Sequence, residues 1–215
     1  MTDKVKRARP QKKRAGDFHH GNLREAVIEA ALRALEDGDP SAVSLRKIAK
    51  TLGVSDPAIY RHFANRDAVL AAAGMRGMQA MMEVMVESAA DALDPAEVLR
   101  AVGRAYVRFA AGHPGWFRLY FSRAYMDRWG DEGDDMHAAM EAERRLKLAL
   151  AELVDEARVD DSYRAIWGLA HGLSNLVTER AFRRVDTDDA RIATADAAIE
   201  IFVDALVAGA SSSTS

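Results

Sequence analysis

The sequence predicts an all-α protein in which a small three-helix unit precedes a larger helical domain. Apolar residues recur at spacings of three and four along most of the chain, which is the period of one helical face. Ser, Asn or Asp before these stretches and Gly after them are typical helix start and stop signals. With 215 residues and 49% hydrophobic content, the chain is long enough to bury a core in each of two domains.

The composition argues against several classes of protein and site. There is no Cys, so the chain can form neither a disulfide nor a thiolate metal site. No apolar run approaches the roughly 20 residues of a membrane span, and the charged N-terminus lacks the apolar core of a secretory signal. Gly-rich phosphate loops, paired-His metal motifs and nucleophile elbows are also missing. We therefore expect a cytoplasmic protein that is not an enzyme and has no catalytic residues, cofactor or metal site.

Charge is divided unevenly along the chain. Lys and Arg outnumber Asp and Glu in residues 1–66, whereas residues 67–215 are acidic. Seven positive charges lie between Lys4 and Arg14, so we expect residues 1–17 to form a basic flexible arm. A solvated tail and an arm that binds nucleic-acid phosphates both explain this composition.

The first helix is expected from Leu23 to Leu35, with Asn22 as its N-cap. The segment from Asp37 to Pro40 ends it, because Gly and Pro together break a helix. A stripe of apolar residues on this helix should face the small core, and its members are Val27, Ala30, Ala31, Ala34 and Leu35.

Two short helices around Gly53 form the centre of the predicted small domain. Ser44 caps the first of them, whose apolar face consists of Leu45, Ile48, Ala49 and Leu52. Gly53 can adopt the left-handed conformation that ends a helix, and Val54 can then fold back on the last turn. Two short helices joined in this way are the plan of a helix-turn-helix.

The second short helix is expected to begin after Ser55 and to run through Phe63. Asp56 and Pro57 favour a helix start, because a carboxylate meets the helix dipole there and a missing N–H costs nothing. Apolar side chains four positions apart, at residues 59 and 63, should point inward. The residues beside and between them are then predicted to face out, and these are Ala58, Tyr60, Arg61 and His62.

Four segments of residues 43–70 carry a family resemblance. In order they are Ser-Leu-Arg-Lys-Ile-Ala, Leu-Gly-Val-Ser, Ala-Ile-Tyr-Arg-His-Phe and Asn-Arg-Asp-Ala-Val-Leu. Together they resemble the DNA-binding domain of the TetR (tetracycline-repressor) family of transcription regulators. The resemblance implies a ligand-responsive repressor that binds a palindromic double-stranded DNA operator as a homodimer and is released by a small molecule.

Two alternatives to this function remain open. One is a helical small-molecule-binding protein or enzyme that has kept a vestigial helix-turn-helix. The other is a regulator that activates transcription, or one that represses without any ligand. Sequence-selective binding to DNA would separate the first alternative from a regulator.

The resemblance also implies which residues contact DNA. Ser44 and Tyr60 are expected to bind phosphates. Side chains expected at or near base edges are Arg46, Ala58, Arg61 and His62. Lys47 and Arg66 are expected to add positive charge near the DNA backbone. Asp56 either accepts a hydrogen bond from a cytosine amino group or only supports the helix start, and Ser55 and Pro57 complete the predicted set.

A long helix is expected to begin at Asn65 or Asp67 and to enter the second domain. Its methionines at positions 75, 78, 82 and 85 form one stripe. Such a stripe is either ordinary core or an adaptable wall for apolar ligands. The predicted domains are 18–66 for DNA binding and 67–210 for effector binding and dimerisation, followed by a disordered tail at 211–215.

An aromatic cluster follows the next predicted helix, Asp94–Gly112. Its four rings, Trp116, Phe117, Tyr120 and Phe121, lie within six positions, and one helix face cannot bury them together. We expect some of them to line an internal cavity or contact a neighbouring helix, while ordinary core remains the alternative for each ring. The segment from Tyr125 to Asp135 is expected to be a solvated acidic loop, because it lacks the ligand spacing of a calcium loop.

Three further helices are expected, at Met136–Val154, Asp161–Phe182 and Asp188–Val207. The last two are more apolar than one domain can cover, which predicts a two-fold, four-helix dimer contact. A charge at Leu173 is accordingly expected to give monomers.

The penultimate helix contains a Trp-Gly-Leu-Ala-His-Gly segment at residues 167–172. It resembles the Trp-x-x-x-His-Gly signature of one C-terminal-domain subclass of TetR-like regulators. His171 is interpreted either as a ligand contact or as a hydrogen-bonded core residue. The predicted ligand-binding residues are Met78, Met82, Tyr106, Trp116, Phe117, Tyr120, Phe121, Trp167, His171 and Asn175.

Overall fold

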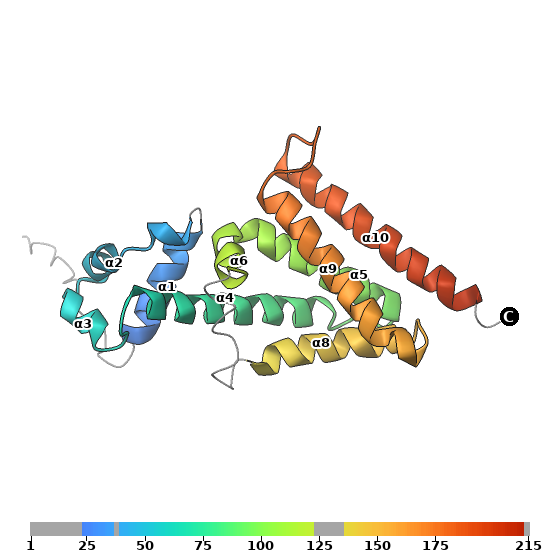
Figure 1. Cartoon of the computed structure of the whole chain (residues 1–215), viewed down its shortest axis with the longest axis horizontal. Helices are drawn as coiled ribbons and strands as arrows, with labels where there is room; N and C mark the ends of the chain where they lie inside the picture. Colours follow the sequence, from blue (N-terminus) through green and yellow to red (C-terminus); the bar gives the residue numbers. More distant parts are fainter. Residues whose placement is uncertain (1–22, 37–38, 123–135, 213–215) are drawn as a thin grey trace, which may run out of the picture.

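The computed structural model describes residues 23–36, 39–122 and 136–212, and these residues form helices with no strand among them (Figure 1). The all-α prediction is therefore confirmed. The helices are α1 (Leu23–Leu35), α2 (Leu45–Leu52), α3 (Asp56–Tyr60), α4 (Arg66–Ser88), α5 (Pro95–Gly112), α6 (Pro114–Tyr120), α8 (Met136–Ala151), α9 (Val159–Thr178) and α10 (Asp188–Ser212), with short 3-10 turns η1 (Pro40–Ala42) and η2 (Glu156–Arg158). None of the described helices is both long and apolar enough to cross a membrane. The predicted arm, the Asn22 cap and the acidic loop lie outside the described residues.

Helix α1 packs against α2, α3 and α4 to form the first of two main cores. Val27, Ala31 and Leu35 are fully buried in it, as the stripe predicted. Ala34 is exposed, so its place in that stripe was wrong. Ile28 and Leu32 occupy the buried face instead, because two large apolar side chains four apart outweigh one methyl group in setting which side faces inward.

The start and stop of α2 follow the predicted chemistry. The Ser44 hydroxyl oxygen accepts a hydrogen bond from the Lys47 N–H at 3.4 Å. Gly53 has a φ of 69°, and the N–H of Val54 donates to the carbonyl of Ala49 at 3.0 Å, which is the bond of a Schellman stop. The sharp turn between α2 and α3 is therefore encoded locally.

Helix α3 is shorter than predicted. It ends at Tyr60, and the N–H of Phe63 reaches back to the carbonyl of Ile59 at 3.1 Å in a turn that still buries the Phe63 ring. Ser55 occupies the N-cap position, but its side chain makes no capping hydrogen bond. The start of α3 thus depends on Asp56 and Pro57.

Helix α4 joins the two main cores. Asn65 caps it by accepting from the N–H of Ala68 at 2.9 Å. Its first turns bury Val69 and Ala73 in the first core, and its later turns bury Met81 and Met85 in the second. Figure 1 shows it running from the α1–α3 group towards α8. A tilt of this helix would move the α1–α3 group relative to the rest.

Helix α5 is central to the second core, where it packs against α4, α8, α9 and α10. Leu99, Tyr106 and Val107 are almost fully buried along it. The boundaries of the surrounding helices differ from the predictions: α8 ends at Ala151, α9 covers Val159–Thr178, and α10 continues to Ser212. The sequence has no Gly or Pro directly after the last residues of these three helices, so it does not mark where they end.

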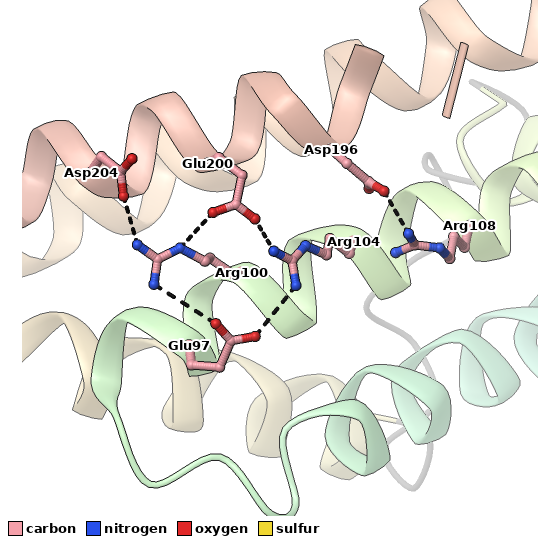
Figure 2. A network of polar contacts seen from close by, with 7 residues as sticks. All are labelled: Glu97, Arg100, Arg104, Arg108, Asp196, Glu200 and Asp204. Carbon is pink, nitrogen blue, oxygen red and sulfur yellow. Dashed lines mark hydrogen bonds and ion pairs between the residues drawn. The ribbon is translucent and has the colours of Figure 1, made fainter. Parts of the chain in front are cut away.

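Ion pairs tie α5 to α10 along their length (Figure 2). The members are Glu97, Arg100, Arg104 and Arg108 from α5 and Asp196, Glu200 and Asp204 from α10. Arg100 places Nε 2.7 Å from Glu200 and Nη2 2.6 Å from Asp204. Isolated surface ion pairs contribute little to stability, but shared partners in a network restrict how the two helices can slide. These contacts occupy one side of α10 and leave Ile201 exposed on another.

Candidate functional site

Helices α2 and α3 present polar side chains to solvent over a buried apolar core. Tyr60 is 55% exposed although it carries a large ring. The other predicted contact residues that are exposed here are Arg46, Lys47, Ser55, Asp56, Pro57, Arg61 and His62. Ser44 is half-buried, and its hydroxyl proton stays available to a phosphate because the cap uses only the oxygen as acceptor. Exposed cations and an aromatic hydroxyl on two packed helices suit a polyanionic partner.

Ala58 does not belong to this exposed surface. It is only 7% exposed and lies on the buried side of α3 with Ile59. The prediction that Ala58 faces out was wrong. Helix α3 is little more than one turn long, and the adjacent residues Ala58 and Ile59 both lie on its buried side. Base contacts from this helix must come from the exposed residues around it.

Arg66 is directed into the protein. Its Nε donates to the carbonyl of Val43 at 2.8 Å, and its Nη2 donates to the carbonyl of Pro40. These two bonds tie the first residue of α4 to the segment that precedes α2. We therefore expect Arg66 to support the fold rather than to add charge at the DNA backbone, because its guanidinium donates to the Val43 carbonyl and shares the Pro40 carbonyl with the N–H of Val43.

Replacing Arg66 by Ala should lower the free energy of unfolding by about 1–3 kcal/mol, because the Val43 carbonyl loses its described donor and the Pro40 carbonyl loses one of two. The dependence of log Kd for DNA on log salt should stay unchanged, and urea unfolding with salt-dependent DNA titration measures both quantities. Arg61→Ala is the matched control: this exposed Arg should reduce the salt slope by about one and leave stability unchanged. A reduced salt dependence of DNA binding in the Arg66→Ala variant would show that Arg66 contacts DNA after all.

The aromatic cluster on α6 divides between two sides of that helix. Phe117 belongs to the second core and lies 5.9 Å from Tyr106 and 4.9 Å from Phe121, measured between ring centroids. Leu119 belongs to the first core, and Trp116 packs against both. Helix α6 therefore contacts the first and the second core at once.

Trp116 makes a polar contact between these two parts. Its indole N–H donates to the carbonyl of Leu32 in α1 at 2.9 Å, and its ring stacks on His113 at 4.3 Å. Gly77 of α4 lies beneath it, where an added Cβ would be 3.5 Å from the ring. The sequence marked Trp116 as a ligand residue and gave no sign of this bond, because its acceptor is a backbone carbonyl 84 positions away.

A small cavity lies between α4, α5 and α6. Of the predicted ligand residues, Met78, Trp116, Phe117, Tyr120 and Phe121 line it, and Gly77, Met81 and Phe109 line it without having been predicted. Its volume is about 10 Å³, which holds no more than one water molecule. Met82 is half-buried against the core and does not line it. In this conformation the rings fill the space themselves.

His171 contacts Phe117 and Phe121 but does not line this cavity. The Tyr106 hydroxyl and His171 Nδ1 are 3.1 Å apart, and the Trp167 ring is stacked on the imidazole at 5.6 Å. Burial raises the pKa of Tyr106 and lowers the pKa of His171, so both are neutral at pH 7. Asn175 is exposed and donates its amide to the carbonyl of His171 at 3.0 Å, so it supports the backbone.

Helices α9 and α10 expose apolar residues that the single chain leaves uncovered. Trp167 and Leu176 on α9 and Ile201 on α10 are the large ones, and Ile201 is 71% exposed. A Cβ added at Gly168 or Gly172 would meet no atom within 4 Å, so no contact within the chain requires these glycines.

Two family models match the chain. Residues 27–73 match the model of bacterial regulatory proteins of the tetR family, and residues 99–206 match that of the tetracyclin repressor-like C-terminal domain. YobS of Bacillus subtilis, an HTH-type transcriptional regulator, is 23% identical over 165 residues, which are 76% of this chain and 83% of YobS.

Solved structures share the fold. SCO7222, a TetR transcriptional regulator from Streptomyces coelicolor, aligns with a TM-score of 0.63 and 19% identity over 86% of this chain and 97% of its own. The structure of BioQ with its double-stranded DNA operator aligns with a TM-score of 0.58 and 21% identity over 86% and 98% of the two chains.

Proposed function

This chain belongs to the TetR family of bacterial regulatory proteins and is a DNA-binding transcriptional regulator, and from that premise we propose that it is a dimeric repressor released from its operator by a small molecule. The proposal places it in the cytoplasm, where it has access to DNA. One observation carries the DNA-binding part: α2 and α3 expose Arg46, Lys47, Tyr60 and Arg61 around a capped turn above a buried core. A surface of this kind fits a major groove and its phosphates.

We propose that two copies associate through α9 and α10. The exposed Leu176 and Ile201 would be buried by a second copy, and the open glycines would let the helices approach closely. Two-fold symmetry then places two α3 helices on one side of DNA, which favours a palindromic operator with half-sites about one helical turn apart.

We further propose that residues 18–66 are the DNA-binding domain and that residues 67–210 receive the effector. The site would lie where Tyr106, Phe117, Phe121, Trp167 and His171 meet. Helix α6 supports this assignment because it contacts these rings on one side and α1, through Trp116, on the other. A ligand that favours a different position of α6 would change the spacing of the α3 helices and so lower the affinity for DNA.

Selection of bound sequences from random duplex DNA tests the function directly. The full chain should enrich a palindromic sequence, and binding should weaken steeply with salt because phosphate contacts release counterions. Fusing the selected operator to a reporter promoter should give lower expression when the protein is present. Enrichment of no sequence would favour a helical binding protein with a vestigial helix-turn-helix, and higher reporter expression would favour an activator.

A further inference from the structure

Five rings from α5, α6, the C-cap of α6 and α9 meet at one place: the imidazole of His171 and the four rings around it. His171 lies 4.3 Å from Phe121, 5.3 Å from Phe117 and 6.4 Å from Tyr106, measured between centroids, in addition to its stack with Trp167. Several of these pairs are edge-to-face, which is the preferred arrangement of aromatic rings and the one an aromatic guest would extend. The aromatic lining of the site therefore favours a flat aromatic ligand.

The hydroxyl of Tyr106 sets the tautomer of His171. This hydroxyl is buried, and its one described partner is Nδ1 of His171. Leaving a buried O–H without an acceptor is costly, so the hydroxyl donates to Nδ1, and the imidazole proton then lies on Nε2. No hydrogen bond within the described residues uses Nε2. The half-buried ring thus offers one N–H donor to a ligand.

No charged side chain in the described part of the chain acts on this donor pair. Within the described residues, the Tyr106 hydroxyl and the His171 imidazole bond only to each other, and no ion pair or hydrogen bond joins either group to a charged side chain. The described cation–π contacts involve Phe63 and Tyr163, which are not among the five rings. A ligand charge would lose its hydration here and find no counter-ion among the described residues that form the site, so the site disfavours anions and cations.

We propose that the effector of this protein is an uncharged, planar aromatic compound with a hydrogen-bond acceptor, such as an aryl carbonyl, held by the rings and by the Nε2–H of His171. The inference rests on the proposed function, in which this site receives the effector. The cavity described above is lined by Phe117 and Phe121 but not by His171 or Trp167, and the rings around His171 contact one another, so a ring must move to admit such a guest. Trp167 is the ring with room to do so, because it is nearly half exposed, and the ligand enters beside it.

Calorimetric titration of the full chain with four related probes tests the ligand class. 2-Acetylnaphthalene is uncharged and carries an acceptor, naphthalene lacks the acceptor, 2-naphthoate is an anion and N-methylquinolinium is a cation. 2-Acetylnaphthalene should bind about tenfold or more tightly than each of the other three. No saturable binding of 2-acetylnaphthalene, or equal binding of either charged probe, would overturn the inference.

Two variants test the hydrogen bond. Tyr106→Phe keeps the ring and the packing but frees the tautomer of His171, and His171→Phe removes the donor. His171→Phe should lose the preference for 2-acetylnaphthalene over naphthalene, and Tyr106→Phe should only reduce it, because a freed imidazole can still place its proton on Nε2. Both should still bind naphthalene, and circular dichroism checks that they remain folded. A preference that persists in His171→Phe would place the acceptor contact elsewhere and contradict the assignment.

DNA binding is measured separately, on the duplex obtained by selection. If the chain selects an operator but binds none of the probes, the ligand class is wrong and the regulatory function stands. If it selects no operator, the proposed function is wrong, and the titrations still decide which chemistry the aromatic site accepts.

Discussion

Replacing Ile201 by Asp should convert the protein to a monomer and weaken operator binding by about 100-fold or more. Ile201 is the most exposed large apolar residue on α10, and a two-fold contact would bring two carboxylates into one apolar surface. A monomer contacts only one half-site, so the gain from binding both halves together is lost. Sedimentation equilibrium gives the oligomeric state, and titration with operator DNA gives the affinity.

Leu148→Asp is the matched control for this change. Leu148 is also exposed, at 54%, but it lies on α8, so its variant should remain a dimer with normal affinity. An Ile201 variant that stays dimeric would exclude this face of α10 as the interface. Leu173 does not serve the same purpose, contrary to the expectation from the sequence: it is 7% exposed within the core of one chain, and a charge there should unfold the protein.

Tyr60→Ala should weaken operator binding by roughly 10- to 100-fold, which corresponds to the 1–3 kcal/mol typical of a good DNA contact. Its thermal stability should match that of the original protein, because the ring is largely exposed. Fluorescence anisotropy with a labelled operator measures the affinity. Unchanged affinity would remove α3 from the DNA interface.

Tyr60→Phe divides the expected effect into two parts. If the hydroxyl binds a phosphate, as proposed, the Phe variant should lose most of the affinity that the Ala variant loses. If the Phe variant binds normally, the ring packs against the DNA sugar or bases and the phosphate role is wrong.

Features that depend on neighbouring residues could be predicted from the sequence. The Ser44 cap, the left-handed Gly53 and the Asn65 cap each require only a few consecutive side chains, and all three are present. Features that depend on which of several neighbouring side chains becomes buried were predicted less well. Ala34 is exposed because larger residues occupy the buried face of α1. Ala58 was predicted to face out on a helix that runs through Phe63, but α3 ends at Tyr60 and Ala58 is buried.

Long-range polar contacts could not be predicted. The carbonyls that accept from Arg66 carry no signal in the sequence, since every residue has a carbonyl. The same holds for Leu32, which accepts from Trp116. The α5–α10 ion pairs use arginines and carboxylates that are also typical of any solvated helix. Of the proposed ligand site, the rings were identified, but the pairing of Tyr106 with His171 required the fold.

The position of α6 between the two cores has a consequence for when the protein senses its effector. Coupling between two binding sites is reciprocal, so an effector that lowers DNA affinity by some factor binds less tightly to the DNA-bound protein by the same factor. Molecules already on an operator would therefore be the less sensitive detectors. The pool of unbound dimers would fill with ligand first, and repression would end mainly because released molecules are no longer replaced.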